Sequence, residues 1–315
     1  MLYISTRDRN DAFTAARTLN IDCAPDGGLF VPFRLPVLTK DEILEMKGQS
    51  FGQNMAQILN LFFSARLTGW DVDFAIGRNP VKKIEMSHRI VVAELWHNPG
   101  ASYDYIVNKL YERICLTIQG RKPTEWFRVA VRIAVLFGIF ADLINKGTVS
   151  SSKPADIAVA ADDLTLAMAC LYARKMGLPV GVIICGCNCN SGLWDLIRRG
   201  EYNPFGVPEN NVLANERLIQ AAFGCEEAFS YAQICKKGRI FSLNEQALAD
   251  LSKGMFAAVV GNTRIASVVA SVQRSGKFCL TDTDAIAYGA LQDYRASITE
   301  GRVSIILADS RPETA

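Results

Sequence analysis

Histidine and charge are both scarce in this sequence, and each shortage excludes a class of function. His88 and His97 are the only two histidines, so a metal site built from several histidines is excluded. Charged residues make up 21% of the chain, and the formal net charge is only +2. No basic face or tail is evident along the sequence. Nucleic acid is therefore not an expected partner.

Long apolar segments are also lacking. The most apolar run, residues 129–144, contains Arg132 and Asp142 and falls short of the roughly 20 residues that a bilayer requires. We therefore predict a buried core helix there and no membrane span. The first residues, MLYISTRD, show no basic and then apolar leader. The nine cysteines are odd in number and lack a framework spacing, which predicts reduced thiols and a cytoplasmic location.

What is present favours an α/β protein. Half of the 315 residues are hydrophobic, enough for a large core. We divide the chain into an N-terminal domain, residues 1–80, and an α/β core, residues 81–315. Strands are predicted at 3–6, 156–160, 180–185, 256–260 and 303–307. Helices are predicted at 11–19, 40–46, 49–67, 126–144, 164–176, 215–223, 244–251, 264–275 and 284–297, with another starting near 192. Alternating strands and helices predict a parallel sheet flanked by helices.

Several motifs resemble segments of the threonine synthases, in the same order along the chain. The most specific is residues 24–32, APDGGLFVP. Residues 94–105, ELWHNPGASYDY, resemble the family segment around the lysine that holds pyridoxal phosphate. Further similarities lie at 3–7, 126–128, 172–179, 188–190, 200–202, 215–218, 282–285 and 307–312. The resemblance implies the fold of a type II pyridoxal-phosphate enzyme with an N-terminal extension.

The lysine itself is missing from this segment. In the family it stands between an aromatic residue and an aspartate, whereas here Asp104 follows Tyr103 directly. The lysine amine forms the imine with the cofactor aldehyde, so its loss removes the usual anchor. Lys109, five residues further, is rotated by about 500° and displaced by over 7 Å along a helix. It is a poor substitute, and a solvated surface lysine is the simpler interpretation.

Two more departures affect the cofactor and substrate sites that the resemblance implies. The family places a small lobe, which holds the substrate carboxylate, where this chain has only residues 116–123, so most of that lobe is deleted. The family also has a glycine-containing phosphate loop, where this chain has Asp162 and Asp163. Two carboxylates there would cap the helix start and repel a phosphate. Asp284 and Arg311 stand where the family has histidines.

Other candidate chemistry is weaker. Cys185, Cys187 and Cys189 would share one face of a continuing strand and could hold a soft metal, but no second pair of ligands accompanies them. Packed reduced thiols are the better interpretation. Asp162 and Asp163 fit helix capping better than paired acid–base catalysis. His97 fits a structural hydrogen bond better than catalysis.

The leading hypothesis is a threonine-synthase-like pseudoenzyme that binds a protein partner, a second copy or a small anionic or amino-acid ligand, with no cofactor expected. Two alternatives stay open. One is a reduced pyridoxal-phosphate-dependent threonine synthase that converts O-phosphohomoserine to threonine with a displaced lysine. The other is a repurposed enzyme that works without the cofactor. The remnant cleft is expected to contain Glu94, His97, Asn98, Asp104, Asp162, Asp163, Asn188, Asp282, Asp284 and Arg311.

Overall fold

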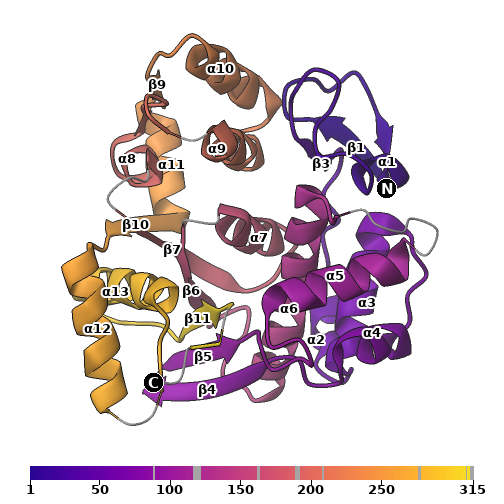
Figure 1. Ribbon diagram of the computed structural model, residues 1–315, viewed down its shortest axis with the longest axis vertical. Coiled ribbons are helices and arrows are strands. Elements are labelled where there is room, and N and C mark those ends of the chain that lie inside the picture. Colours follow the sequence, from indigo (N-terminus) through magenta and orange to yellow (C-terminus); the bar gives the residue numbers. More distant parts are fainter. Residues whose placement is uncertain are drawn as a thin grey trace.

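The computed structural model of the protein describes residues 1–87, 89–115, 122–161, 164–188, 192–207, 209–275, 278–309 and 311–312. A six-stranded sheet lies at its centre and helices cover both of its faces (Figure 1). The expected α/β class is therefore confirmed. The expected boundary at residue 80 stays a prediction, since one continuous core contains side chains from both sides of it.

The central sheet is mixed, with the strand order β10-β7-β6-β11-β5-β4. Its parallel strands are β5 (Ile90–Glu94), β6 (Ala155–Ala160), β7 (Val180–Cys187), β10 (Met255–Val259) and β11 (Ser304–Ala308). The edge strand β4 (Lys82–Ser87), which sequence analysis did not anticipate, pairs antiparallel with β5. The carboxyl ends of the parallel strands meet at one edge of the sheet, which is where α/β proteins usually place their sites.

Each face of the sheet has its own apolar core, because successive side chains of a strand point to opposite faces. Ile157 and Ile305 belong to the larger core, on the side of α7 (Leu164–Lys175). Ala158 and Ile306 belong to the smaller core, beneath α12 (Asn262–Arg274) and α13 (Asp282–Ala296). Because both faces of these strands are buried, their sequences are continuous apolar runs.

The N-terminal elements form a small antiparallel sheet followed by helices. The sheet contains β1 (Leu2–Ser5), β2 (Phe13–Thr14) and β3 (Phe30–Pro32), and the helices are α1 (Ala15–Thr18), α2 (Lys40–Met46), α3 (Phe51–Phe63) and α4 (Gly69–Ile76). The predicted helix at 11–19 is wrong, since Phe13 pairs with Tyr3 of β1 and only one helical turn follows. The predicted helix at 49–67 ends at Phe63, because Ser64 is left-handed with φ 52°.

Two consecutive helices connect β5 to β6 and pack against the N-terminal helices α4 and α3. They are α5 (Tyr103–Ile114) and α6 (Glu125–Asn145), and only residues 115–124 join them. No room remains there for the small lobe that the family resemblance implies. The helix α6 packs against α3 and α7, and most of its residues are buried, as its apolar sequence predicts. No helix of the described residues has the length and apolar content to cross a bilayer.

The remaining elements form a helical layer beyond β10, at the upper left of Figure 1. They are α8 (Gly192–Arg199), β8 (Glu201–Tyr202), α9 (Glu209–Phe223), α10 (Cys225–Lys236), β9 (Phe241–Ser242) and α11 (Glu245–Gly254). The short strands β8 and β9 pair antiparallel. The apolar faces of α8 and α11 lie near the sheet, with α8 packed on β10 and α11 on α8.

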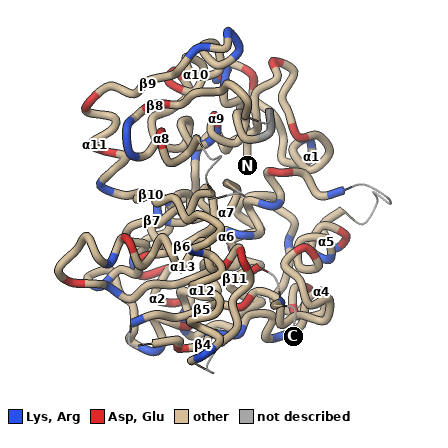
Figure 2. Tube along the Cα trace, turned by 60° about the vertical axis from the view of Figure 1, so that its left-hand side comes forward, with Lys and Arg blue, Asp and Glu red and all other residues tan. Residues whose placement is uncertain are grey.

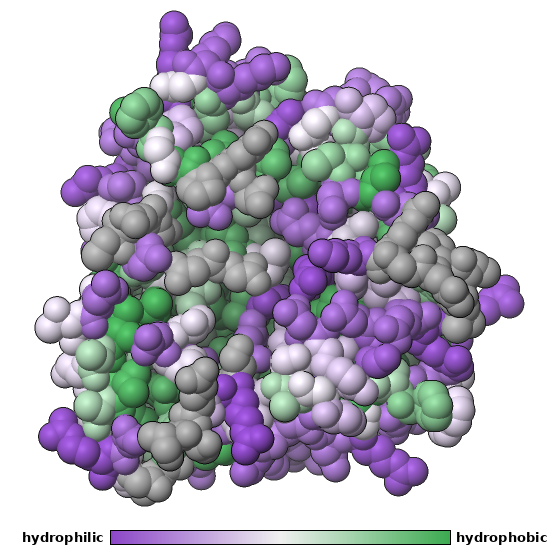
Figure 3. Space-filling model, viewed as in Figure 1, coloured by the Kyte–Doolittle hydropathy of each residue, from purple (hydrophilic) through white to green (hydrophobic). Residues whose placement is uncertain are grey.

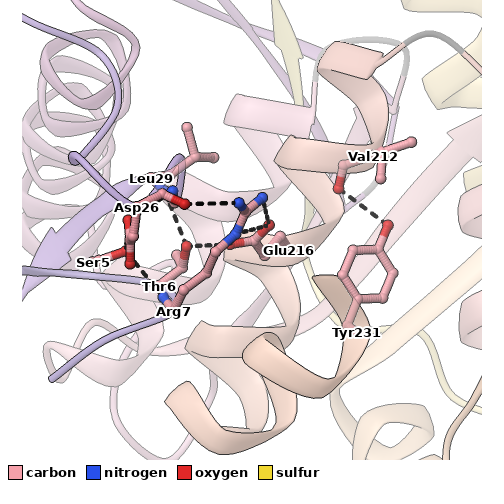
Figure 4. Close-up of polar contacts among 9 residues, drawn as sticks. Ser5, Thr6, Arg7, Asp26, Leu29, Val212, Glu216 and Tyr231 are labelled. Carbon is pink, nitrogen blue, oxygen red and sulfur yellow. Dashed lines mark hydrogen bonds and ion pairs between the residues drawn. The ribbon is translucent and has the colours of Figure 1, made fainter. Parts of the chain in front are cut away.

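A partly buried ion pair ties this helical layer to the N-terminus (Figure 4). The guanidinium of Arg7 meets the carboxylate of Glu216 at 2.8 Å, and the Thr6 hydroxyl donates to the same carboxylate. Arg7 also donates to the backbone carbonyl of Asp26 at 3.2 Å, and the Leu29 N–H donates to Thr6 Oγ1 at 3.0 Å. These contacts explain the place of the 24–32 motif, whose turn is held against α9 through Arg7.

The surface carries both signs of charge without separation. In Figure 2 the basic and acidic residues alternate along the trace instead of gathering on one face. In Figure 3 apolar surface shows at the left of the view, over α12 and α13, while the region of α4 and α5 is mostly hydrophilic. This distribution is in keeping with the small net charge, and it offers no extended basic surface in the part of the chain that is described.

Candidate functional site

The candidate site lies at the carboxyl edge of the sheet, where the first strand–helix connection is built around Asn98. The Asn98 side-chain amide donates to the carbonyls of Leu95 at 3.1 Å and Ser102 at 2.7 Å, and its Oδ1 accepts from the Gly100 N–H at 2.9 Å. Asn98 is 7% exposed. One buried side-chain amide therefore holds the conformation of this turn. Asn98 thus has a structural role in the predicted cleft.

Two polar side chains of this connection pair with each other. Glu94, the last residue of β5, is buried and accepts a short contact from Nε2 of His97. The His97 ring stacks on Trp96 with 4.0 Å between the ring centroids, and the guanidinium carbon of Arg311 lies 6.0 Å from the Trp96 centroid. Glu94, His97 and Arg311, three of the residues expected in the remnant cleft, are thus linked through one another or through Trp96. The partner of His97 is thus a buried side-chain carboxylate.

The helix that would carry the family lysine begins here without one. Ser102 caps α5 by accepting from the Tyr105 N–H at 3.2 Å. Tyr103 is buried, and its hydroxyl donates to the Arg128 carbonyl at 3.2 Å. The Asp104 side chain points to solvent and forms an ion pair with Arg128 at 2.6 Å. Neither side chain at the start of α5 offers an amine to the cleft.

Lys109, the only lysine of α5, lies on the outer face of the helix. Its side chain is 39% exposed, and its ammonium meets the Glu112 carboxylate at 2.7 Å. The hydrogen bond to Glu112 raises the pKa of Lys109 above its ordinary value. An imine-forming lysine needs the opposite, a buried amine with a lowered pKa. The geometry therefore argues against Lys109 as a displaced Schiff-base residue.

A partly buried ion pair occupies the interior of the site. Arg132 of α6 and Asp309, directly after β11, approach to 2.9 Å with side-chain exposures of 7% and 28%. The Arg132 guanidinium carbon lies 4.4 Å from the Tyr103 ring centroid, a cation–π distance. Sequence reasoning did not assign either residue to the site. The signal was nevertheless visible, since Arg132 is a lone arginine within the most apolar run of the chain.

A third carboxylate, Asp284, faces the same interior from α13. It is 2% exposed and forms a capping box with Thr281, whose N–H and hydroxyl donate to Asp284 Oδ2 at 3.1 and 2.7 Å. Burial raises the pKa of Asp284 to about 6; the Thr281 hydrogen bonds oppose this shift, while Asp309 and Glu94 add to it. Glu94, Asp284 and Asp309 therefore form an acidic group with Arg132 as its internal cation. Asp282, in contrast, is exposed at the helix start.

The remaining predicted site residues are placed as follows. Asn188 directly follows β7 and is half-buried. Asp162, Asp163 and Cys189 lie outside the described residues. Cys185 and Cys187 are both buried in the larger core, and burial raises the pKa of Cys185 well above its ordinary value. The described residues contain no group of three metal-binding side chains, and a buried neutral thiol is a poor metal ligand.

Two cavities lie beside this site. One of about 410 Å³ is lined by Arg128 at the start of α6, Thr165 at the start of α7 and Asn211 of α9. A wider one of about 1140 Å³ lies between the Arg7–Glu216 pair and α10. Glu94, His97, Asp284 and Asp309 line neither of them.

The residues present do not fit pyridoxal phosphate. The start of α5 offers no amine for an imine, and the sole lysine of that helix points to solvent. A phosphate dianion would meet the carboxylates of Glu94, Asp284 and Asp309, and Arg132 beside them is already paired with Asp309. The loop sequence before α7 adds Asp162 and Asp163 without a glycine. We therefore derive no chemical step through this cofactor.

Comparisons with known proteins agree with this geometry at two levels. Residues 2–77 match the family model for the threonine synthase N terminus. The chain is 31% identical over 79 residues to threonine synthase-like 1 of Pongo abelii and 30% identical to that of Homo sapiens. Each of these alignments covers 25% of this chain but only 11% of the relative's length.

Similarity to solved structures covers nearly the whole chain. Against pyridoxal-phosphate-bound threonine synthase from Brucella melitensis the TM-score is 0.81 at 16% identity, covering 99% of this chain and 89% of that chain. Against the yeast threonine synthase it is 0.81 at 15% identity, covering 99% and 87%. This protein has the threonine synthase fold. At 315 residues it is smaller than those solved chains, which agrees with the short connection between α5 and α6.

Proposed function

We propose that this protein is a threonine-synthase-like pseudoenzyme, which keeps the fold, has lost the pyridoxal-phosphate chemistry and acts by binding. One observation carries the proposal: at the helix start where the fold presents its imine-forming lysine, the chain has Tyr103 and Asp104. Tyr103 is buried against Arg132, and Asp104 is paired with Arg128 in solvent. Without an amine at this place the covalent link to an aldehyde cofactor cannot form.

The charges of the cleft support the same proposal. An active site for a phosphate-bearing cofactor keeps unpaired donors and a positive potential ready for the anion. Here Arg132 forms an ion pair with Asp309, and His97 meets the carboxylate of Glu94. Each of these two side chains therefore has an acidic partner within the cleft. Such internal pairing lowers the attraction of this part of the cleft for a phosphate dianion.

The two other hypotheses have less support. A reduced threonine synthase would need Lys109 as its imine residue, but that ammonium faces solvent beside Glu112. An enzyme that works without the cofactor would need a free acid or base, and Asp284 with a pKa of about 6 is the best candidate. Its Oδ2 is already committed to capping α13 through Thr281, so a structural task accounts for its burial.

An activity assay tests the proposal directly. Purified protein, with and without added pyridoxal phosphate, is given O-phosphohomoserine, and phosphate release is measured alongside an active threonine synthase. We expect no release above the protein-free background, and the same result for Lys109→Ala. Turnover that depends on the cofactor and disappears in Lys109→Ala would support the reduced enzyme instead. Turnover that persists in Lys109→Ala would mean that the protein is an enzyme and that Lys109 is not its imine-forming residue. The pseudoenzyme proposal and the displaced-lysine alternative would then both be wrong.

A further inference from the structure

One edge of the central sheet, the outer side of β4, is open to another strand. β4 is the last strand at its end of the sheet, and in Figure 1 it runs along the lower margin. Its inner side pairs with β5, and no strand of the described residues pairs with its outer side. The strand at the opposite end, β10, is packed against α8, α11 and α13. The outward N–H and C=O groups of β4 are therefore a template for a further strand.

The side chains of β4 divide between the two faces of the sheet. Ile84 and Met86 are partly buried against the smaller core. Lys83 and Glu85 point to the opposite face, because side chains alternate along a strand. On that face Lys83 meets Asp142 of α6 at 3.2 Å. Glu85 is exposed and forms no ion pair within the described part of the chain.

The charges beside Lys83 are unbalanced by one. Lys146 approaches the same Asp142 carboxylate at 3.1 Å, so two ammonium groups share a single carboxylate. The three side chains together carry a net charge of +1. Glu85 has the opposite sign, but its own carboxylate faces solvent. A second copy of β4 lying alongside the first would bring another Glu85 to this place.

Charge selects one register for two antiparallel copies of β4. About a twofold axis normal to the sheet, residues that lie opposite each other share a face. An axis through Lys82 or Lys83 sets lysines against each other, and an axis through Glu85 sets two carboxylates against each other. An axis through Ile84 places Lys83 of each copy opposite Glu85 of the other. Like charges directly opposite are destabilising, so the register centred on Ile84 is favoured.

We propose that the protein pairs with a second copy of itself through β4, antiparallel and centred on Ile84, so that two six-stranded sheets join into one. Glu85 of each copy then lies beside Lys83 and Lys146 of the other and balances their charge. Lysines and a bulge, such as that between Glu85 and Ser87, usually discourage edge pairing, and here they exclude the other registers. This contact does not depend on the proposed function.

Sedimentation velocity of the full chain measures the association. A single strand pair is a small interface, so we expect a dissociation constant on the order of 100 µM. Samples from about 5 to 500 µM at about 50 mM salt should therefore pass from monomer to a mostly dimeric state.

Two variants with the same charge change locate the contact. Glu85→Lys sets an ammonium opposite Lys83 of the other copy and should raise the dissociation constant at least about tenfold. Glu226→Lys is the control, because Glu226 is exposed on α10, at the other end of the molecule from β4 in Figure 1. It should leave the dissociation constant unchanged.

Cysteine cross-linking tests the register, in a background in which the exposed Cys23 and Cys279 are replaced by serine. Ile84→Cys sets two thiols opposite each other with Cβ atoms about 4.5–5.5 Å apart. Mild oxidation should then give a covalent dimer. Lys82→Cys is the control, because its two thiols would be about 14 Å apart along the paired strands and should not cross-link.

Three results would contradict the proposal. A monomer at every concentration would show that the outer side of β4 does not take up a second copy. A dimer that is equally stable in Glu85→Lys and Glu226→Lys would place the contact elsewhere on the surface. Cross-linking of Lys82→Cys but not of Ile84→Cys would refute the register.

Discussion

The carboxyl group of Asp284 gives a quantitative test of how the cleft is held together. Burial raises its pKa from 3.8 to about 6 in the folded protein. Between these two values the folded state binds the proton more strongly than the unfolded chain does. The contribution of the neutral carboxyl to stability is therefore complete below about pH 4 and is lost as the pH rises through about 6. A difference of about two pKa units corresponds to about 3 kcal/mol.

Asp284→Asn removes this titration while retaining a capping oxygen at the same position of α13. Asparagine is uncharged at every pH, as the Asp284 carboxyl group is in the folded protein at low pH. We expect the variant and the natural protein to have similar free energies of unfolding near pH 4. At pH 7 and above, the variant should be more stable by about 2–3 kcal/mol, because it no longer buries a charge beside Glu94 and Asp309.

The measurement is urea unfolding of both proteins at half-unit steps from about pH 4 to pH 8, with the m-values compared to confirm two-state behaviour. The informative quantity is the difference between the two curves, since other titrating groups are common to both. Asp282→Asn, at the exposed start of the same helix, is the matched control and should show no pH-dependent difference. A difference between Asp284→Asn and the natural protein that does not vary with pH would refute the reasoning.

Three further predictions concern other parts of the account. Arg132→Met should lower the free energy of unfolding by about 2–4 kcal/mol, because it leaves the Asp309 carboxylate without its cation. Adding Asp309→Asn should recover part of that loss in a double-mutant cycle measured by urea unfolding. Strictly additive effects of the two substitutions would contradict the pairing. Gly177→Ala should cost about 2–4 kcal/mol, since Gly177 has φ +105° and an added Cβ would meet the Leu38 carbonyl oxygen at 2.6 Å; an unchanged Tm would contradict this geometry. Lys109→Ala should leave Tm and the absorbance spectrum with pyridoxal phosphate unchanged, and a lost absorbance band would identify Lys109 as an imine residue.

Local signals predicted most of the fold. The helix at 40–46 has the predicted bounds, and its Thr39–Glu42 capping box is readable from the sequence. The buried strands β6 and β7 were predicted because parallel strands covered on both faces are apolar throughout. The helix at 11–19 was wrong because pairing of Phe13 with β1 overrode local helical preference. The edge strand β4 was not found, since its sequence KKIEMS is polar and half-exposed.

The site was predicted less completely, because its contacts join distant parts of the chain. The clustering of Glu94, His97 and Arg311 followed from a family motif and the turn chemistry beside it. The Arg132–Asp309 pair was not predicted, since it requires knowing that α6 crosses the carboxyl end of β11. Similarly, a sequence shows that Asn54 is polar within a helix but not that its Oδ1 is buried without a donor. Burial and long-range pairing arise only when the helices pack.

The most direct test of the central claim is to trap the imine. The protein is incubated with pyridoxal phosphate, reduced with borohydride, digested and examined by mass spectrometry, with an active threonine synthase treated in parallel. We predict that peptides covering α5 and the carboxyl edge of the sheet keep their unmodified masses. A reduced pyridoxyl group on any lysine of the cleft, formed at stoichiometric levels, would contradict the account.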